Sequence, residues 1–330
     1  MSTEKIGIIL ATYNPNLEHL EKQLKSIQRQ TWTQWVCHIC DDASSFNLRN
    51  FLSQYTQQDQ RFICHFHQEN VGVNSNFERG LRYLQNDPEI AYIAFCDQDD
   101  IWQQTKLIKL REALARERAI LAHSDLEIID AQGKSIYSSV WQYENRQPEK
   151  LTPKLLLLRN TVTGCTMMFS RNLLRQILPF PKQNKPDGWY HDHWVALVAA
   201  HHGKIVHIRE SLVKYRQHDN NTVGTQKDTG TIRQEFVLWL GKRGRLTLKS
   251  YKIHCNLSKA FYQRFYPYAN QNKINPFSEQ PLDFGFSILK LGIHSALVGY
   301  GSQGNTLRLV VNKFIFDCLR IKGWLLRQST

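Results

Sequence analysis

Residues 91–102 read AYIAFCDQDDIW, and this stretch decides the fold prediction. The apolar first half is typical of a strand that is buried on both faces, as in a parallel sheet. The run ends abruptly in Asp97, Asp99 and Asp100. In an extended chain Asp97 and Asp99 point to the same side, and two carboxylates about 4 Å apart repel by roughly 4 kcal/mol at an effective dielectric near ~20. A buried strand end needs a partner that relieves this repulsion.

Two interpretations of the aspartates remain open at this point. A hard divalent cation whose coordination is completed by phosphate oxygens would neutralise the carboxylates. Alternatively, the aspartates cap a helix that is expected to begin near Trp102. Capping explains one aspartate well and three poorly.

Strands and helices alternate through the first part of the chain, around the opening stretch. The strands are predicted at 6–12, 35–40, 61–67 and 91–96, and the helices at 17–30, 47–57 and 75–84. This alternation predicts an open α/β sheet whose ligand binds outside the carboxyl ends of the strands. Polar residues 13–14, 41–42, 70–72 and 97–99 are therefore expected along one edge.

The segment from residue 119 to residue 217 is less regular. We predict strands at 119–129, 163–169, 205–208 and 212–217, a loop over 140–153 and a helix over 195–200. Asp192, at the start of that helix, is either a general base or the helix N-cap. The indoles of Trp102, Trp189 and Trp194 either form flat apolar platforms for a ligand or pack in the core.

The predicted strand–helix units of residues 1–120 contain neither the GxGxxG fingerprint nor the Walker phosphate loop. Any diphosphate bound here is therefore expected to depend on a metal more than on a glycine-rich cradle. Cys37 and Cys40 form a CxxC within a predicted strand, where they face opposite ways and belong to the core. Seven cysteines without framework spacing, a polar start at 1–6 and no apolar run of transmembrane length favour a cytoplasmic protein.

Charge is concentrated at the end of the chain. Residues 236–330 contain 14 Lys and Arg against 3 Asp and Glu, whereas the whole chain carries a net charge of +13. Such a segment predicts an anionic partner, either nucleic acid or a membrane surface. Residues 307–326 predict an amphipathic basic helix that lies on an anionic membrane face or packs on the catalytic domain or another subunit.

Several motifs occur in an order that resembles a known family. They are ATYNPN (11–16), DDAS (41–44), ENVGVNSNFERGL (69–81), FCDQDDIW (95–102), TGCTMMF (163–169), DHW (192–194) and YRQH (215–218). Together they resemble the family 2 inverting glycosyltransferases with the GT-A fold, especially bacterial rhamnosyltransferase-like members. The resemblance covers residues 4–223 and implies an open mixed sheet flanked by helices.

The resemblance implies a role for each matching residue. It implies Mn²⁺ or Mg²⁺ bound by Asp99 directly, with Asp97 on the ion or the ribose and His218 as a late metal or diphosphate ligand. Asp192 matches the catalytic base, and Asp100 is then left as the helix cap. The nucleotide-binding positions are Ala11, Tyr13, Asn14, Asp42, Asn70, Gly72 and Asn76. The family's Glu-Asp pair is His191-Asp192 here, and His191 is grouped with Trp102, Trp189 and Trp194 in acceptor binding.

The predicted function is transfer of a sugar, with inversion, from dTDP-rhamnose or a UDP-hexose to a hydroxyl of a glycan or lipid-linked glycan acceptor, in bacterial surface polysaccharide synthesis. A catalytic domain is predicted over 1–228 and a basic, mainly helical region over 229–330. The alternative is a metal-dependent nucleotide phosphohydrolase or nucleotidyltransferase. A nucleic-acid binder is not expected, because its phosphates would be repelled by the strand-end carboxylates. Oligomerisation and contact with the inner face of the cell membrane are compatible with the sequence.

Overall fold

The computed structural model describes residues 4–44, 46–149, 151–182, 190–217, 244–270, 274–278 and 287–290, and the single positions 293, 310 and 313. The chain divides into two compact units. The first contains residues 1–144, 162–180 and 190–226, and the second contains 145–161, 181–189 and 227–330. The second unit thus takes in two internal segments besides the C-terminal region. All described candidate site residues belong to the first unit.

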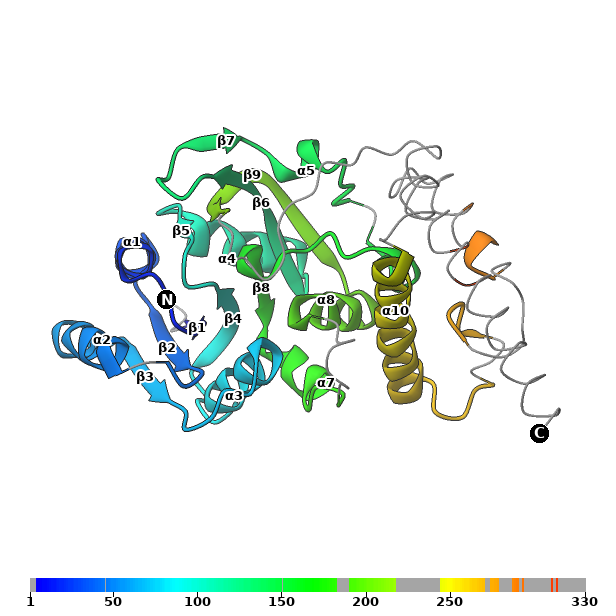
Figure 1. Cartoon of the computed structure of the whole chain (residues 1–330), viewed down its shortest axis with the longest axis horizontal. Helices are drawn as coiled ribbons and strands as arrows, with labels where there is room; N and C mark the ends of the chain where they lie inside the picture. Colours follow the sequence, from blue (N-terminus) through cyan, green and yellow to red (C-terminus); the bar gives the residue numbers. More distant parts are fainter. Residues whose placement is uncertain are drawn as a thin grey trace. The chain divides into compact units, whose positions relative to one another are not determined.

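The first unit is built on a single mixed sheet (Figure 1). Among the described residues its strand order is β3-β2-β1-β4-β8-β6-β9-β5, and β7 pairs with β6 at the side. The strands are β1 (Lys5–Thr12), β2 (Trp35–Asp41), β3 (Phe62–Phe66), β4 (Ile90–Cys96), β5 (Ile101–Trp102), β6 (Leu121–Ile129), β7 (Ser135–Tyr137), β8 (Met167–Ser170) and β9 (Ile205–Arg216).

The strands differ in direction. β1 to β4 are parallel where they pair, β8 runs antiparallel to both β4 and β6, and β6 and β9 are parallel to each other. The described helices of this unit are α1 (Leu17–Gln28), α2 (Phe46–Gln58), α3 (Val73–Gln85), α4 (Lys106–Glu117), α5 (Val140–Tyr143), α7 (Leu174–Ile177) and α8 (His191–His202). The predicted open sheet with flanking helices is confirmed.

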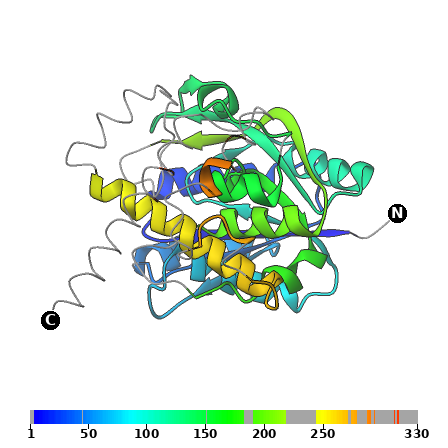
Figure 2. The same ribbon diagram turned by 90° about the vertical axis from the view of Figure 1, so that its right-hand side faces the viewer.

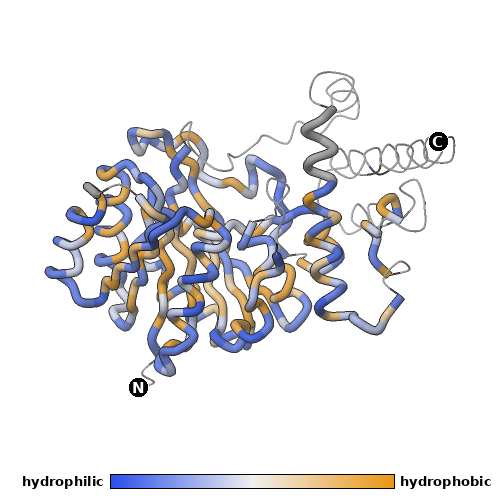
Figure 3. Tube along the Cα trace, turned by 60° about the horizontal axis from the view of Figure 1, so that its bottom comes forward, coloured by the Kyte–Doolittle hydropathy of each residue, from blue (hydrophilic) through white to orange (hydrophobic). Residues whose placement is uncertain are grey.

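Alternation along β1 divides the core between the two faces of the sheet. Ile6, Ile8 and Leu10 belong to one buried cluster with apolar side chains of α1, α2 and α4. Gly7, between them, points to the other face, where a Cβ would lie 2.6 Å from Leu84 of α3. Helices therefore cover both faces (Figures 1 and 2), and the hydropathy trace is hydrophobic along the strands and hydrophilic in many of the loops (Figure 3).

α3 packs unusually closely on the sheet because of its glycine. A Cβ at Gly80 would lie 2.4 Å from Ile9 Cγ2 and 3.3 Å from the Cys40 sulfur. The helix begins after Gly72, which has φ of 85°, a conformation that side chains rarely adopt. These two glycines bring the start of α3 close to the carboxyl ends of β1 and β2.

Three local predictions were wrong. The helix expected near Trp102 begins only at Lys106, because residues 101–102 form β5 and pair with β9. The two short strands expected over 205–217 are one strand, β9. The predicted loop 140–153 contains α5 in the first unit and the start of α6 (Pro153–Leu158) in the second. The second unit also contains α10 (Gly244–Phe265).

A partly buried histidine pair lies on the α3 side of β2 and β3. His38 Nδ1 is 2.9 Å from His65 Nε2, and the rings are stacked, with the Tyr83 ring stacked 3.7 Å from that of His65. Burial lowers the pKa of His38 from 6.5 to about 4, and the nearby His65 adds to the effect. Folding therefore favours the neutral form of His38.

We predict acid sensitivity from this pair. Because the pKa of His38 is lower in the folded state, its contribution to stability is complete above pH 6.5 and is lost as the pH falls towards 4. The wild-type free energy of unfolding should fall by up to about 3 kcal/mol more than that of His38→Phe over this range. Urea unfolding at several pH values measures the difference. An identical pH dependence in both proteins would contradict the assignment.

Candidate active site

The carboxyl ends of β1, β2 and β4 meet at one edge of the sheet, as the sequence predicted. Thr12 is in register with Asp41 between β1 and β2, and Leu10 with Cys96 between β1 and β4. Residues 97–100, which we call the aspartate loop, follow β4 directly and therefore lie beside the loops after β1 and β2. Side chains far apart in the sequence are brought together here by the sheet.

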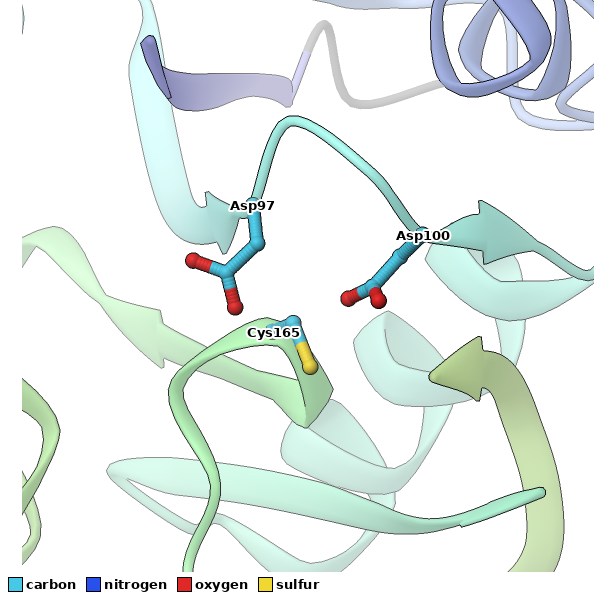
Figure 4. Close-up of side chains that lie close together, drawn as sticks. All are labelled: Asp97, Asp100 and Cys165. Atoms are coloured by element: carbon cyan, nitrogen blue, oxygen red, sulfur yellow. The ribbon is translucent and has the colours of Figure 1, made fainter. Parts of the chain in front are cut away.

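Asp97 groups with Asp100 and Cys165 rather than with Asp99 alone. One possible ligand atom of each of these three residues lies within 4.8 Å of the others. Figure 4 shows Asp97 at the end of β4, Asp100 just before β5, and Cys165 between them on the short 3-10 helix η1 (Gly164–Thr166). The sequence argument assumed an extended chain, but the chain turns after Cys96, so Asp100 faces Asp97 across the turn.

Asp100 is not a helix cap, which corrects the prediction. It is fully buried, and its Oδ1 accepts a hydrogen bond from the backbone N–H of Arg216 at 3.1 Å. α4 has Thr105 at its N-cap. Asp100 thus anchors the aspartate loop to the end of β9.

The carboxylates of this edge raise one another's pKa. Burial, followed by the charges of Asp99 and Asp192, raises the pKa of Asp97 from 3.8 to about 7. Burial and the charges of Asp99 and Asp97 raise the pKa of Asp100 well above its ordinary value. Burial also lowers the pKa of the Lys106 amine to about 7. The site therefore favours an additional cation.

Arg216, the last residue of β9, holds the aspartate loop from a second side. Its side chain is fully buried, and its Nε donates to the backbone carbonyl of Asp99 at 2.9 Å. One terminal nitrogen donates to the carbonyls of Asp130 and Ala131 at 3.0 and 2.9 Å. The guanidinium thus joins the aspartate loop to the turn after β6.

The loop after β1 contacts both neighbouring loops. The Tyr13 N–H donates to Gln98 Oε1 at 2.8 Å, and Gln98 Nε2 donates to the Tyr13 carbonyl at 3.3 Å. The N–H of Asn14 donates to Ser44 Oγ at 2.7 Å. Tyr13 and Asn14 are exposed, and Ala11 is half-buried in β1. These three predicted nucleotide-binding positions lie together at the edge.

Asp42 organises the segment before α3. Its two carboxylate oxygens accept the N–H groups of Val71 and Gly72 at 2.9 and 2.8 Å, and Asn70 donates to its carbonyl at 3.3 Å. The fold thus brings together three of the predicted nucleotide-binding positions, Asp42, Asn70 and Gly72. Contact of Asp42 with a pyrimidine base stays a prediction.

Asn76 lies inside the protein instead of facing a ligand. It is 2% exposed, and its Nδ2 donates to the carbonyl of Cys40 at 2.8 Å. The N-cap of α3 at Gly72 places Asn76 one turn inside the helix, against the end of β2. Its role in this structure is to hold α3 to the sheet.

Asp192 lies in the first turn of α8, although it is not the N-cap, which is Tyr190. Its Oδ2 accepts the N–H of Gly164 at 3.2 Å, and its Oδ1 accepts the N–H of His193 at 2.6 Å. The charge of Asp192 contributes to the raised pKa of Asp97. The predicted base and the aspartate loop therefore belong to one electrostatic site.

His191 points away from solvent into an aromatic pocket. Its ring stacks on Phe77 at 3.8 Å and meets Phe95 edge-on, and neither ring nitrogen has a hydrogen-bond partner among the described residues. Burial lowers its pKa from 6.5 to about 3. A neutral ring packed in this way is a core element, so direct acceptor binding by His191 is not supported.

The tryptophans follow the core-packing alternative where they are described. Trp194 is fully buried, and its indole N–H donates to the carbonyl of Ile177 at 3.0 Å. Trp102 is 3% exposed, and the Lys106 amine lies 3.1 Å from its ring centroid. Neither offers a face to a sugar. Trp189 and His218 lie outside the described residues.

The sequence reasoning missed three residues of this site, namely Gln98, Cys165 and Arg216. Each lies within a quoted motif, but none was given a role. An arginine at the end of a predicted strand could have been matched to the surplus of aspartates, because a buried guanidinium requires several acceptors. The contacts of Gln98 and Cys165 are long-range and leave no periodic signal.

The sequence of residues 7–178 matches the family model described as Glycosyl transferase family 2. The chain belongs to this family. This glycosyltransferase has no helix long and apolar enough to cross a membrane in the part of the chain that the structure describes.

Three curated proteins from bacteria are similar to this family 2 glycosyltransferase. The putative teichuronic acid biosynthesis glycosyltransferase TuaG of Bacillus subtilis is 28% identical over 52% of this chain and 64% of its own length. UDP-Glc:alpha-D-GlcNAc-diphosphoundecaprenol beta-1,3-glucosyltransferase WfgD of Escherichia coli is 26% identical over 71% of this chain and 85% of its own. The dTDP-rhamnosyl transferase RfbG of Shigella flexneri is 27% identical over 69% and 80%.

Solved structures support the same fold at much lower sequence identity. S. aureus TarS 1-349, crystallised with UDP-GlcNAc, has a TM-score of 0.56 at 13% identity and covers 94% of this chain and 91% of its own. The mannosyltransferase PcManGT of Pyrobaculum calidifontis, in complex with GDP-Man and Mn²⁺, has a TM-score of 0.51 at 14% identity, with 97% and 87% covered. The glycosyltransferase therefore has the GT-A fold.

We predict that Asp97→Asn stabilises the metal-free protein. Because folding raises the pKa of Asp97 to about 7, its ionised form destabilises the fold increasingly from about pH 4 to pH 7. Removing the charge should raise the free energy of unfolding by about 2 kcal/mol at pH 8, and less at pH 5. Urea unfolding in the presence of EDTA measures the gain, with exposed Glu112→Gln as the control. A loss of stability at pH 8 would contradict this reading.

Proposed function

We propose that the chain is an inverting, metal-dependent glycosyltransferase that uses a nucleoside-diphosphate sugar, either dTDP-rhamnose or a UDP-hexose. The observation that carries the proposal is the position of Asp192, whose Oδ2 accepts the N–H of Gly164 beside Cys165, while ligand atoms of Cys165, Asp97 and Asp100 lie within 4.8 Å of one another. WfgD, a UDP-Glc glucosyltransferase by name, and RfbG, a dTDP-rhamnosyl transferase by name, suggest the two donor classes. The acceptor is a hydroxyl of a glycan or lipid-linked glycan, in bacterial surface polysaccharide synthesis.

The aspartate loop fits a divalent cation. Asp97, Asp99 and Asp100 lie within four residues, and burial together with the neighbouring carboxylate charges raises the pKa values of Asp97 and Asp100, so a cation there would favour their ionised forms. Carboxylate oxygens suit Mn²⁺ and Mg²⁺. We assign the ion to Asp97 and Asp99, because Asp100 is buried and engaged with Arg216. A bound ion would supply Lewis-acid stabilisation of the leaving diphosphate.

Asp192 is the proposed base. A carboxylate can accept the proton of the acceptor hydroxyl as that oxygen attacks the anomeric carbon and the bond to the diphosphate breaks. The N–H groups of Gly164 and His193 fix the orientation of the carboxylate. Since a carboxylate oxygen has more than one lone pair, each oxygen can still receive a proton or a further hydrogen bond. Single displacement from the face opposite the diphosphate inverts the anomeric centre.

The alternative of a phosphohydrolase or nucleotidyltransferase is not favoured. It requires the same carboxylates to activate water or a second phosphate, and it leaves Asp192 without an assigned role. Membership of a glycosyltransferase family also argues against it.

Two substitutions should separate donor binding from transfer. Asp99→Ala should abolish Mn²⁺-dependent donor binding, because it removes the proposed metal ligand. Asp192→Asn should bind donor normally but lose transfer by at least about 100-fold, the scale of general-base catalysis. A thermal-shift screen of UDP- and dTDP-sugars with Mn²⁺ selects the donor, and calorimetry and a transfer assay then compare the variants. Full transfer by Asp192→Asn would sink the base assignment.

The basic charge of the C-terminal region favours binding of the acceptor at a membrane surface. Most of residues 307–326 lie outside the described residues, so the amphipathic helix predicted there stays a prediction. The net positive charge of residues 236–330 remains a property of the sequence. We propose that this region contacts an anionic membrane that carries a lipid-linked acceptor.

We predict that the full chain floats with vesicles that contain anionic phospholipid at low salt. Binding should weaken sharply at high salt, because salt screens the attraction between basic residues and anionic headgroups. Neutral phosphatidylcholine vesicles are the control in the same flotation gradient. Equal recovery with neutral and anionic vesicles, or no recovery with either, would count against membrane contact through charge.

A further inference from the structure

Gln98 lies in the sequence between the two proposed metal ligands, Asp97 and Asp99. Its side chain contacts the loop after β1, at Tyr13. Its side-chain amide bonds both backbone polar groups of Tyr13. It accepts from the N–H at 2.8 Å and donates to the carbonyl at 3.3 Å. The pairing resembles one rung of a β-sheet formed by a side chain. A single donor–acceptor contact would allow the Tyr13 loop to pivot, whereas two hinder rotation.

The connection continues from Tyr13 to the loop after β2. Asn14 has φ of 41°, a left-handed backbone that requires support, and its N–H donates to Ser44 Oγ at 2.7 Å. Ser44 in turn donates its N–H to Asp41 Oδ2 at 2.8 Å, and Asp41 Oδ1 accepts from the Thr12 hydroxyl at 2.9 Å. The loops after β1, β2 and β4 are thereby fixed to one another, with Gln98 as the link to the aspartate loop.

We propose that Gln98 is a positioning residue. It keeps the loop after β1, with the predicted nucleotide-binding residues Tyr13 and Asn14, at a fixed spacing from the aspartate loop. The inference rests on the proposed function, because a nucleoside diphosphate bound there would span both loops. A donor that needs both loops in place binds with an apparent affinity proportional to the fraction of molecules in which the loops are correctly placed. Gln98 raises that fraction without touching the metal.

A purely structural role for Gln98 would mean that its loss lowers the melting temperature and the affinity for the metal alone. The positioning role predicts neither change. Tyr13 is 49% exposed, so its hydrogen bonds to Gln98 compete with water and add little to global stability. Loss of Gln98 should therefore leave the melting temperature and the affinity for the metal alone unchanged. Only the affinity for a ligand that spans the two loops should fall.

The test compares Gln98→Met, which keeps the length of the side chain and removes both hydrogen bonds, with Gln57→Met on exposed α2. UDP and dTDP are titrated by calorimetry in the presence of Mn²⁺, and Mn²⁺ alone is titrated by electron paramagnetic resonance. We expect about tenfold weaker nucleotide binding by Gln98→Met, as when the correctly placed fraction falls to about a tenth. The affinity for Mn²⁺ alone and the melting temperature should match those of the wild type, and Gln57→Met should match it throughout.

Hydrogen exchange gives an independent measurement on the same proteins without nucleotide. The amides of Tyr13 and Asn14 should exchange faster in Gln98→Met, because the Tyr13 N–H loses its acceptor. If the wild type binds a nucleotide and Gln98→Met binds it equally well, the positioning role of Gln98 is wrong while the proposed function stands. Equal losses of Mn²⁺ and nucleotide affinity in Gln98→Met would also contradict the positioning role. A wild-type chain that binds neither nucleotide overturns the proposed function as well.

Discussion

Confinement of Asp97, Asp99 and Asp100 to one short loop is the constraint on which the rest of the site depends. Burial, followed by the charges of the neighbouring carboxylates, raises the pKa values of Asp97 and Asp100. The fold holds them there because β4 is fixed on both sides, by β1 and by β8. Arg216 adds a backbone N–H for Asp100 and a guanidinium on the Asp99 carbonyl. The negative charge that remains unbalanced is what the proposed cation would neutralise.

The loops of this edge are fixed mainly by hydrogen bonds to backbone groups. Asp42 accepts two backbone N–H groups, Arg216 donates to three carbonyls and Gln98 pairs with one peptide. Such contacts set the path of the main chain and leave exposed side chains, such as that of Tyr13, available for a ligand. Preorganisation of this kind lowers the entropy cost of binding. The ordered edge is thus a property of the free protein.

Local patterns predicted the fold well. Apolar runs, helical periods and polar strand ends placed the first four strands, and parallel pairing then gathered residues such as Tyr13 and Asp42 at one edge. The prediction failed where a distant partner decides the structure. Asp100 looked like a helix cap, but its partner Arg216 is 116 residues away, and the same strand draws residues 101–102 into β5. Burial of Asn76 and His191 likewise depends on how helices meet the sheet.

Cys165 places a neutral side chain beside Asp97 and Asp100. Burial, followed by the charges of Asp100 and Asp97, raises the pKa of its thiol well above the ordinary value. The sulfur therefore stays protonated and neutral beside the two carboxylates. An aspartate at this position would add a further negative charge where two carboxyl groups already resist ionisation, and a lysine would compete with the cation. A small, neutral and polarisable side chain fills the gap without either cost, which leaves the proposed metal as the means of balancing the charge.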